Sequence, residues 1–377
     1  MSRGVLALVE SRLVGADLVS ELERMDWEVD RLPPEAIGIE SFRDYARSRA
    51  PSALVSINHS PELAWLATRE GSTRYVSWTV DPLPVERLGI LDGTRVDDVR
   101  IFLHRSSQVP LFRALGFPHV QWLPLAAPRR RFGQAPGILE RRLPVAFVGS
   151  SLADEIALFE QALARWGLSG AEAEPLRAAV DGIALAALDD FAFQGFSPAG
   201  GDVPAPLLQL SREAPARVAE ALNARISATF RAGRVGALAA TGASVHGDAR
   251  WKDVVGEAWK GALPDGLPLT SVYAGSLANV DVPRVHQRDI ATLRAFDVAA
   301  SGGCLVAEPS TDLVALLEPE REFLPYRDGS ELAAVLARLA ADPALSTEIG
   351  ARARSRAEAE HTLESRALRI AESLGTG

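Results

Sequence analysis

The chain has 377 residues, of which 47% are hydrophobic and 24% charged, and its net charge is −9. A chain of this length exceeds what one hydrophobic core usually supports, so two domains are expected. The acidic balance argues against a nucleic-acid-binding protein and against a protein of the membrane surface, because both need a basic excess. Cys304 is the only cysteine, which excludes an intrachain disulfide and a cysteine-based metal cluster.

No apolar stretch reaches the roughly 18 residues that a membrane-spanning helix needs. The apolar run at 5–9 is followed at once by the charged residues Glu10 and Arg12, unlike the pattern of a signal peptide. The sequence therefore predicts a cytoplasmic protein without a membrane span.

In the first part of the chain, short apolar runs alternate with helical patterns. The expected strands are 5–9, 27–29, 53–57, 75–80 and 99–103, and the expected helices are 17–25, 42–49, 60–68 and 109–115. Strands that alternate with helices predict a parallel sheet with helices on its faces.

The second half repeats this alternation after a segment rich in Pro, Gly and Arg at 128–143, which is typical of a linker. Its three arginines, Arg129 to Arg131, either lie in a solvated linker, the favoured interpretation, or hold phosphate. The expected strands are 145–148, 243–246, 277–280, 304–307 and 324–326, and the expected helices are 153–234 (broken near 196–206), 285–300, 312–317, 331–340 and 347–374.

We therefore expect an α/β protein of two doubly wound domains. The first domain covers 1–127, and the second covers 144–355 with a helical insertion at 153–234. A final long helix, 356–377, can cross back to the first domain.

The segment around the expected helix 285–300 holds the most informative side chains. If the helix runs to residue 300, Arg294 and Asp297 lie one turn apart on the same face. A carboxylate near a strand end can accept hydrogen bonds from a ribose diol, and an arginine beside it can bind phosphate. The alternative is a surface ion pair of little energetic weight. The residues alone leave both open.

Several motifs occur in a fixed order along most of the chain. They are Ser77-Trp78-Thr79-Val80-Asp81-Pro82, Val120-Gln121-Trp122-Leu123-Pro124, Val145-Ala146-Phe147-Val148-Gly149-Ser150, Arg294-Ala295-Phe296-Asp297, Ala300-Ser301-Gly302-Gly303, Glu308-Pro309-Ser310-Thr311, Phe323-Leu324-Pro325-Tyr326 and Glu360-His361-Thr362. In this order they resemble CgeB-like (spore-maturation) glycosyltransferases, which are related to the family-1 glycosyl transferases.

The resemblance implies a GT-B architecture, in which two Rossmann-like domains face each other across a cleft. The donor would bind the C-terminal domain and the acceptor mainly the N-terminal one. The implied reaction moves a sugar from a nucleotide-diphosphate donor, with a UDP-sugar favoured, to a hydroxyl of a protein, a polysaccharide or a small molecule. Protein cations and helix N-termini, rather than a metal or another cofactor, would hold the diphosphate.

The same resemblance assigns roles to individual residues. Asp297 stands five residues before Gly302, the position of the carboxylate that binds the donor ribose, although relatives often have Glu there. Arg294 and Arg288 would neutralise the leaving diphosphate. Asp289 stands eight residues before Asp297, as in retaining relatives, but the residues around it do not match their motif.

Further candidates for donor binding follow strands or line the expected pocket. Gly149 and Gly247 would let the backbone approach a nucleotide, Trp251 would stack on the base, and Tyr273 would line the pocket. Gly302 is a further donor-binding candidate. For Trp251 and Tyr273, packing in the core is the alternative.

In the first domain, His59, Asp81 and His104 each follow an expected strand, on the side where open α/β sheets bind ligands. Any of the three is a candidate base for the acceptor hydroxyl. Asp81 could equally shape a turn with Pro82, and this second role is favoured.

Two other functions stay open at this point. A sugar-nucleotide epimerase would use the same fold without an acceptor. A non-catalytic nucleotide-binding or assembly protein would retain the fold without turnover.

Overall fold

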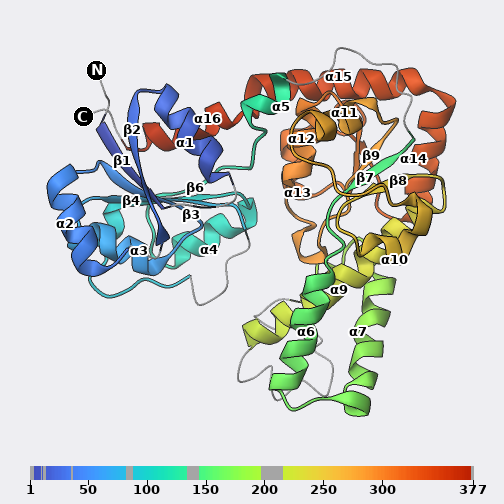
Figure 1. Cartoon of the computed structure of the whole chain (residues 1–377), viewed down its shortest axis with the longest axis horizontal. Coiled ribbons are helices and arrows are strands. Elements are labelled where there is room, and N and C mark those ends of the chain that lie inside the picture. Colours follow the sequence, from blue (N-terminus) through green and yellow to red (C-terminus); the bar gives the residue numbers. More distant parts are fainter. Residues whose placement is uncertain are drawn as a thin grey trace. The chain divides into compact units, whose positions relative to one another are not determined.

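The computed structural model describes residues 4–374 except 10, 12–13, 35–36, 82–87, 134–143 and 197–214. By its internal contacts the chain divides into two compact units, both drawn in Figure 1. Unit 1 consists of Met1–Arg129 and Ala359–Gly377, and unit 2 is Arg130–Glu358.

Unit 1 is built on a six-stranded parallel sheet with the order β2-β1-β3-β4-β5-β6. The strands are β1 (Gly4–Val9), β2 (Trp27–Leu32), β3 (Ala53–Ile57), β4 (Arg74–Thr79), β5 (Val99–Leu103) and β6 (Val120–Trp122). The strands expected at 53–57 and 99–103 are confirmed to the residue, while β6 was missed as a strand. Because the chain reverses its direction of winding between β1 and β3, the carboxyl ends of these strands form the crevice where such sheets bind ligands.

Helices cover both faces of this sheet. They are α1 (Gly15–Arg24), α2 (Ile39–Arg49), α3 (Pro61–Trp65) with a π-helical turn (Leu66–Glu70), α4 (Val109–Ala114) and α16 (Leu363–Glu372). Figure 1 shows α1 and α16 on one face and α2, α3 and α4 on the other. Ser60 caps α3, since its hydroxyl accepts a hydrogen bond from the amide of Leu63 at 3.2 Å.

Unit 2 contains a second parallel sheet, of five strands, with the order β11-β10-β9-β7-β8. The strands are β7 (Ala146–Val148), β8 (Ser244–His246), β9 (Asn279–Val280), β10 (Leu305–Ala307) and β11 (Leu324–Pro325). Numbered from its own first strand, this sheet has the winding of the sheet of unit 1. Its reversal lies between β7 and β9, so their carboxyl ends mark the expected ligand crevice.

The helices of unit 2 form an inner set on the sheet and an extension away from it. They are α5 (Arg129–Gly133), α6 (Ala153–Arg165), α7 (Glu174–Ala186), α9 (Pro215–Ala239), α10 (Trp251–Val255), α11 (Leu267–Gly275), α12 (Leu293–Ala300), α13 (Thr311–Leu316), α14 (Gly329–Ala341) and α15 (Pro343–Glu360). The first residue of α5 and the last two residues of α15 belong to unit 1. The expected linker thus contains a short helix, and the rest of it, 134–143, lies outside the described residues.

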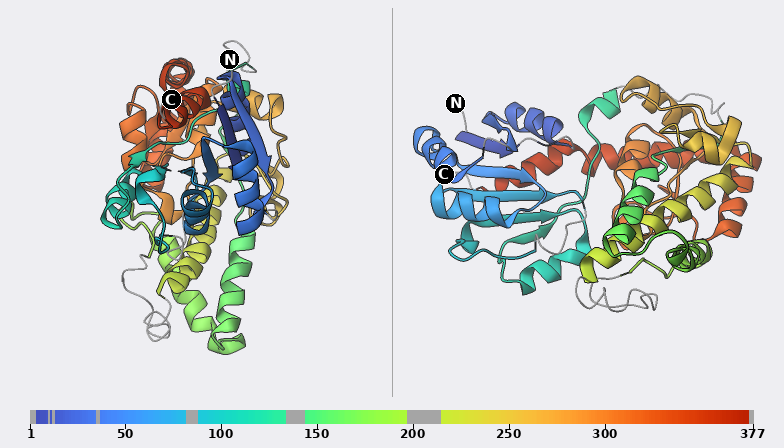
Figure 2. Two further views of the ribbon diagram at one scale, coloured as in Figure 1. Left: turned by 90° about the vertical axis from the view of Figure 1, so that its left-hand side faces the viewer. Right: turned by 60° about the horizontal axis from the view of Figure 1, so that its bottom comes forward.

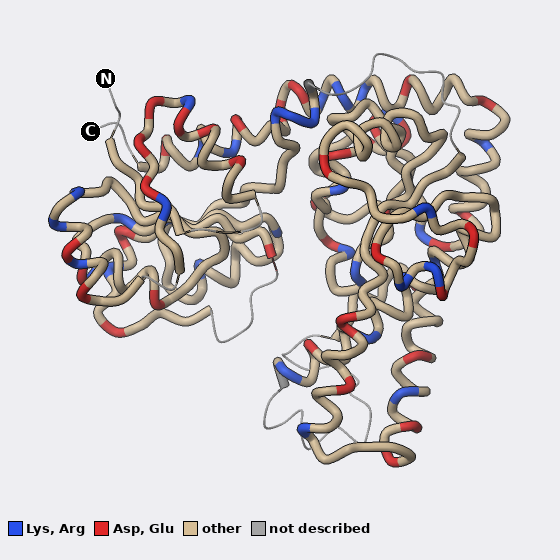
Figure 3. Tube along the Cα trace, in the orientation of Figure 1, with Lys and Arg blue, Asp and Glu red and all other residues tan. Residues whose placement is uncertain are grey.

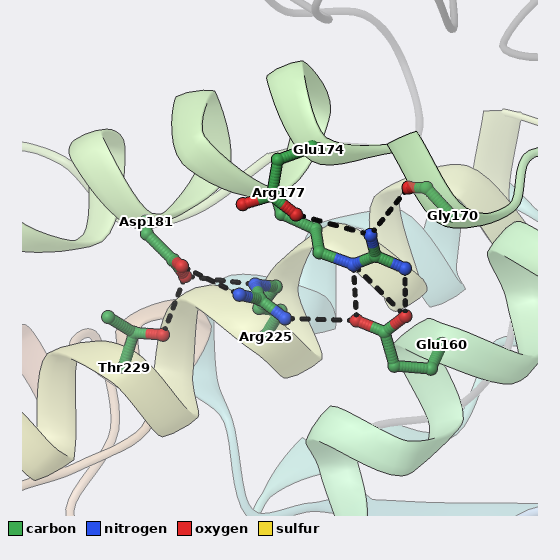
Figure 4. A network of polar contacts seen from close by, with 7 residues as sticks. All are labelled: Glu160, Gly170, Glu174, Arg177, Asp181, Arg225 and Thr229. Atoms are coloured by element: carbon green, nitrogen blue, oxygen red, sulfur yellow. Dashed lines mark hydrogen bonds and ion pairs between the residues drawn. The ribbon is translucent and has the colours of Figure 1, made fainter. Parts of the chain in front are cut away.

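The extension consists of α6, α7 and the first half of α9, which run side by side away from the sheet in Figures 1 and 2. Figure 4 shows the ion pairs that join the three helices. Arg225 on α9 binds Asp181 of α7 at 2.6 Å and Glu160 of α6 at 3.1 Å, and Arg177 of α7 binds Glu160 at 2.7 Å. Since Arg225 contacts both other helices, it holds the extension together.

One predicted helix, 285–300, is wrong in its first half. The chain forms only a 3-10 turn at Val285–Gln287, and α12 begins at Leu293. Two carbonyl groups that a continuous helix would use internally are bound by the start of α13 and its N-cap residue. The carbonyl of Asp289 accepts from the amide of Asp312, and that of Ile290 from the hydroxyl of Ser310. These two tertiary contacts keep the chain before Leu293 out of the helix. Arg294 therefore lies in the first turn of α12.

The predicted long C-terminal helix is also wrong, since it is two helices, α15 and α16, separated by His361 and Thr362. At the break, Ala127 pairs with the chain on both sides. Its amide donates to the carbonyl of His361, and its carbonyl accepts from the amide of Leu363. Thr362 then caps α16 by accepting from the amide of Ser365 at 3.2 Å.

Among the described residues, no helix combines the length and the apolar character that a membrane span requires.

Candidate functional site

Arg294 lies at the carboxyl ends of β7 and β9, the ligand crevice of unit 2. Its Nε donates to the carbonyl of Val148, the last residue of β7, at 2.6 Å. Its Nη1 is paired with Asp281, which follows β9 directly. The guanidinium is therefore fixed at the point where the sheet changes its direction of winding, as a phosphate-binding side chain would be.

Two more arginines reach the same place from other elements. Arg231, on α9, donates to the carbonyl of Ser150 just after β7 at 3.2 Å. Arg284, four residues after β9, is paired with Glu155 in the first turn of α6. We call Arg231, Arg284 and Arg294 the arginine cluster.

Of the three arginines in the cluster, Arg231 has the fewest contacts that neutralise its charge. Its side chain is buried, and within the described part of the chain its Nε has no hydrogen-bond partner and no carboxylate is paired with it. Burial lowers the pKa of Arg231 to about 9, and the positive charges of Arg294 and Arg284 add to this effect. A buried cation beside two others is costly unless an anion joins it, so the cluster is suited to bind an anion of more than one charge.

The anion site is local. In Figure 3 basic and acidic residues are interspersed along the trace of each unit. Within the described ranges there is also no group of three or more His, Cys, Asp or Glu side chains that could hold a metal ion.

Three residues predicted to approach the nucleotide instead pack the loop after β7. A Cβ on Gly247 would lie 2.1 Å from the carbonyl oxygen of Gly149, and a Cβ on Gly149 would lie 2.6 Å from Nη2 of Arg294. Trp251 is fully buried against Phe147, and its Nε1 donates to the same Gly149 carbonyl at 2.7 Å. The prediction that Trp251 stacks on a base is therefore wrong. Because Gly247 has no side chain, the loop after β8 can pack closely against the loop after β7.

Asp297 lies one turn after Arg294 on α12, as predicted. Its carboxylate is bound by Arg131 of α5, with Nε to Oδ1 at 3.1 Å, and Arg131 also binds Asp265 at 2.7 Å. Burial raises the pKa of Asp297, and Arg131 opposes the rise. Arg130, the residue before Arg131, also pairs with Asp265, at 3.0 Å. Both of these linker arginines therefore make ion pairs within unit 2.

Tyr273, at the end of α11, lies close enough to Arg294 and Asp297 for both charges to act on its phenol. Its side chain is buried, and burial raises the pKa of the phenol. Its backbone carbonyl accepts from Asn279 of β9 at 2.8 Å. Tyr273 therefore packs behind Arg294 and Asp297.

Two other predicted donor-binding residues have different roles. Arg288 is fully buried, and its guanidinium is engaged by Glu308 and by three backbone carbonyls, so it is not available to a phosphate. Gly302 has a φ of 72° in the turn that ends α12 and precedes β10. It therefore lies at the amino end of β10, the opposite edge from the crevice. Both predictions are wrong.

In unit 1, Asp81 follows β4 and stands beside Asn58, which follows β3. The side-chain NH2 group of Asn58 donates to Asp81 at 3.0 Å, and its side-chain oxygen accepts from the backbone amides of Val80 and Asp81. Asn58 adopts a φ of 67°, and these bonds hold that conformation. Asp81 is half-buried, and Pro82, with which it was predicted to form a turn, lies outside the described residues.

The two histidines predicted as bases are in the core of unit 1. The ring of His59 has no exposed surface and packs against the rings of Tyr75, Phe112 and Phe117 at 5.3 to 5.8 Å. His104 is 2% exposed, and its Nδ1 donates to the carbonyl of Thr79 at 2.9 Å. A base must contact the acceptor, and this burial contradicts the predicted role of both residues.

The burial of His59 makes the stability of unit 1 depend on pH. Burial lowers the pKa of His59 to about 4, while an unfolded chain keeps the usual value of about 6.5. The unfolded state therefore takes up a proton first, and stability falls as the pH decreases from about 6.5 to about 4. We expect this residue to contribute a loss of about 3 kcal/mol across that window.

Urea unfolding of unit 1 at pH 7 and pH 4.5, followed by tryptophan fluorescence, tests the effect. His59→Leu should lose less stability on acidification than the wild type, and a matched change at the exposed His119, His119→Gln, should not. Equal losses in the wild type and in His59→Leu would contradict the argument.

The arginine cluster was only partly found from the sequence. Arg294 was found, but Arg231 and Arg284 were not. Asp281 follows an expected strand, so the rule that singled out Asp81 would also have found it. Arg231 lies in the middle of a long helix, where no strand end marks it.

The arginine cluster lies in a part of the chain that matches a known family model. Residues 220–372, which include Arg231, Arg284 and Arg294, match the family model described as "Glycosyl transferase-like". No curated protein matches the chain significantly.

Solved structures of low sequence identity share the fold over nearly the whole chain. A glycosyltransferase from Rickettsia africae has a TM-score of 0.58 at 9% identity and covers 98% of this chain and 97% of its own. Sucrose-phosphate synthase from Thermosynechococcus elongatus has a TM-score of 0.55 at 13% identity, with 98% of both chains covered. Anabaena HepE, in a complex with UDP and glucose, has a TM-score of 0.53 at 10% identity, with 99% of this chain and 100% of its own covered. The fold is α/β of the GT-B type, and with the matching domain it defines a glycosyltransferase.

Proposed function

We propose that this glycosyltransferase takes its sugar from a nucleoside-diphosphate donor held by the arginine cluster of unit 2. The observation that carries the proposal is the position of the cluster. Three guanidinium groups from α9, α12 and the loop after β9 meet at the reversal point of the sheet, and the buried Arg231 has no carboxylate partner among the described residues. A diphosphate supplies the negative charge that this arrangement calls for.

The chemistry that the cluster would perform is stabilisation of the leaving group. When the sugar departs, the terminal phosphate of the donor gains negative charge, and fixed cations in a buried place stabilise that charge without reorganising. Asp297 would hold the ribose after exchanging part of its contact with Arg131. Asp81 remains the candidate base for the acceptor hydroxyl, because it is the only one of the three proposed bases that is not fully buried.

We further propose UDP as the nucleotide, on the analogy of HepE, whose structure contains UDP and glucose. The order of the sequence motifs favours a CgeB-like member of the superfamily. A cytoplasmic location fits a chain whose single cysteine, Cys304, is buried. The acceptor class stays a protein, a polysaccharide or a small molecule.

A thermal-shift screen of the purified protein against UDP, GDP, CDP and dTDP tests the donor site. A nucleotide at about 100 times its dissociation constant should stabilise unit 2 by about 2.7 kcal/mol. Matching sugar nucleotides should then release the free nucleotide only when an acceptor is added. Release of an altered sugar without an acceptor would indicate an epimerase, and binding without any turnover would indicate a non-catalytic protein.

A further inference from the structure

Asp281 is a carboxylate of the arginine cluster, where it is paired with Arg294 and its charge acts on Arg231. It is the first residue after β9, and its side chain is buried. Its Oδ1 is paired with Nη1 of Arg294, and its Oδ2 accepts a hydrogen bond from the hydroxyl of Thr292 at 2.5 Å. A carboxylate therefore already neutralises one of the three cations that a phosphate would use.

The free site carries less charge than its arginines suggest. Asp281 is paired with Arg294 and Glu155 with Arg284, while Arg231 binds only a backbone carbonyl among the described residues. Three cations and two carboxylates leave one net positive charge. A nucleoside diphosphate carries about two negative charges while esterified to a sugar and about three once released, because its terminal phosphate then ionises further. The site is thus closer to electrical balance with the sugar nucleotide than with the product.

We propose that Asp281 limits how tightly this site retains the leaving nucleoside diphosphate and so promotes its release. The proposal rests on the proposed function, since it takes the arginine cluster as the diphosphate site. Asp281 acts in two ways. It competes with phosphate oxygens for Arg294, and it repels the charge that appears on the product.

Glu308 provides a matched comparison. It is the first residue after β10, the strand next to β9, and it is ion-paired with a buried arginine, Arg288, at 2.8 Å. The guanidinium of Arg288 is engaged within the protein and lies outside the arginine cluster. Neutralising Glu308 therefore removes an equivalent buried carboxylate without freeing a cation for phosphate.

The experiment compares the wild type, Asp281→Asn and Glu308→Gln by titration calorimetry. The probe is whichever of UDP, GDP, CDP and dTDP the wild type binds most tightly. Asparagine keeps the shape, its single side-chain oxygen can still accept from Arg294, and its NH2 group can donate to the hydroxyl of Thr292, so the change removes mainly the charge. We expect Asp281→Asn to bind the nucleoside diphosphate about tenfold more tightly and to release it more slowly in stopped-flow displacement. Glu308→Gln should bind it as the wild type does.

The possible outcomes separate this proposal from the proposed function. If the wild type binds one of the nucleotides and Asp281→Asn binds it equally or more weakly, Asp281 positions Arg294 instead of competing for it, and the inference is overturned. An equal gain in affinity in Glu308→Gln would also overturn it, because the effect would then be one of general charge. If the wild type binds none of the four nucleotides, the proposed function itself fails.

Discussion

Replacing Arg231 with methionine is expected to weaken nucleotide binding strongly without destabilising the protein. The side chain is buried, its Nε has no partner among the described residues, and Arg294 and Arg284 repel it. Methionine fills a similar volume without charge, so unit 2 should keep its stability or gain about 1 kcal/mol. Loss of one cation from a buried diphosphate site should weaken donor binding and slow turnover by about 100-fold.

Thermal unfolding with and without the preferred nucleotide measures both effects, and Arg225→Met is the matched control. Arg225 lies on the same helix, less than two turns before Arg231, but it joins α6 and α7 in the extension. Arg225→Met should therefore lower the unfolding temperature and keep the nucleotide-induced shift. If the nucleotide raised the unfolding temperature of Arg231→Met as much as that of the wild type, the proposed site would be contradicted.

Replacing Gly247 with alanine is expected to be among the most destabilising single changes in unit 2. The added Cβ would lie 2.1 Å from the carbonyl oxygen of Gly149 and 2.9 Å from the Trp251 ring. Both atoms belong to rigid parts of the fold, since the carbonyl is held by the indole nitrogen of Trp251 at 2.7 Å. Relief of the clash must move the loop after β7, and we expect a loss of about 3 kcal/mol or more.

Chemical denaturation followed by far-UV circular dichroism measures this loss, and Gly182→Ala is its control. Gly182 lies inside α7, and a Cβ added there would meet no atom of another element within 4 Å, so alanine should stabilise the helix by about 0.5 to 1 kcal/mol. Because the loop after β7 borders Arg294, Gly247→Ala should also weaken nucleotide binding in the fraction that folds. Unchanged stability would show that the two loops do not pack as described.

The periodic parts of the fold were predictable from the sequence, and the breaks in it were not. Buried strands such as β3 and β5 have local signals, apolar runs bounded by polar residues, and they were found with their bounds. The interruption of the helix at 285–300 and the division between α15 and α16 depend on bonds from distant segments. Bonds from Ser310 and Asp312 interrupt the expected helix at 285–300, and bonds from Ala127 separate α15 from α16. A local pattern carries no trace of such contacts.

The site was predictable only where its residues follow a strand or a recognisable motif. Arg294 has the motif of the resemblance and lies at the crevice. His59, His104 and Trp251 also follow strands, but aromatic and aliphatic neighbours bury them, and burial depends on tertiary packing that one sequence does not reveal. Arg231 is the opposite case, since its position inside α9 looks like that of any helical arginine until the fold brings it to β7.

The most direct test of the account is a crystal structure of the protein with UDP, or with whichever nucleoside diphosphate produces the largest thermal shift. The account predicts that the two phosphates lie at the carboxyl ends of β7 and β9, within hydrogen-bonding distance of Arg231 and Arg294. A nucleotide bound elsewhere in unit 2, with the arginine cluster still held by Asp281, Glu155 and the carbonyls of Val148 and Ser150, would contradict it.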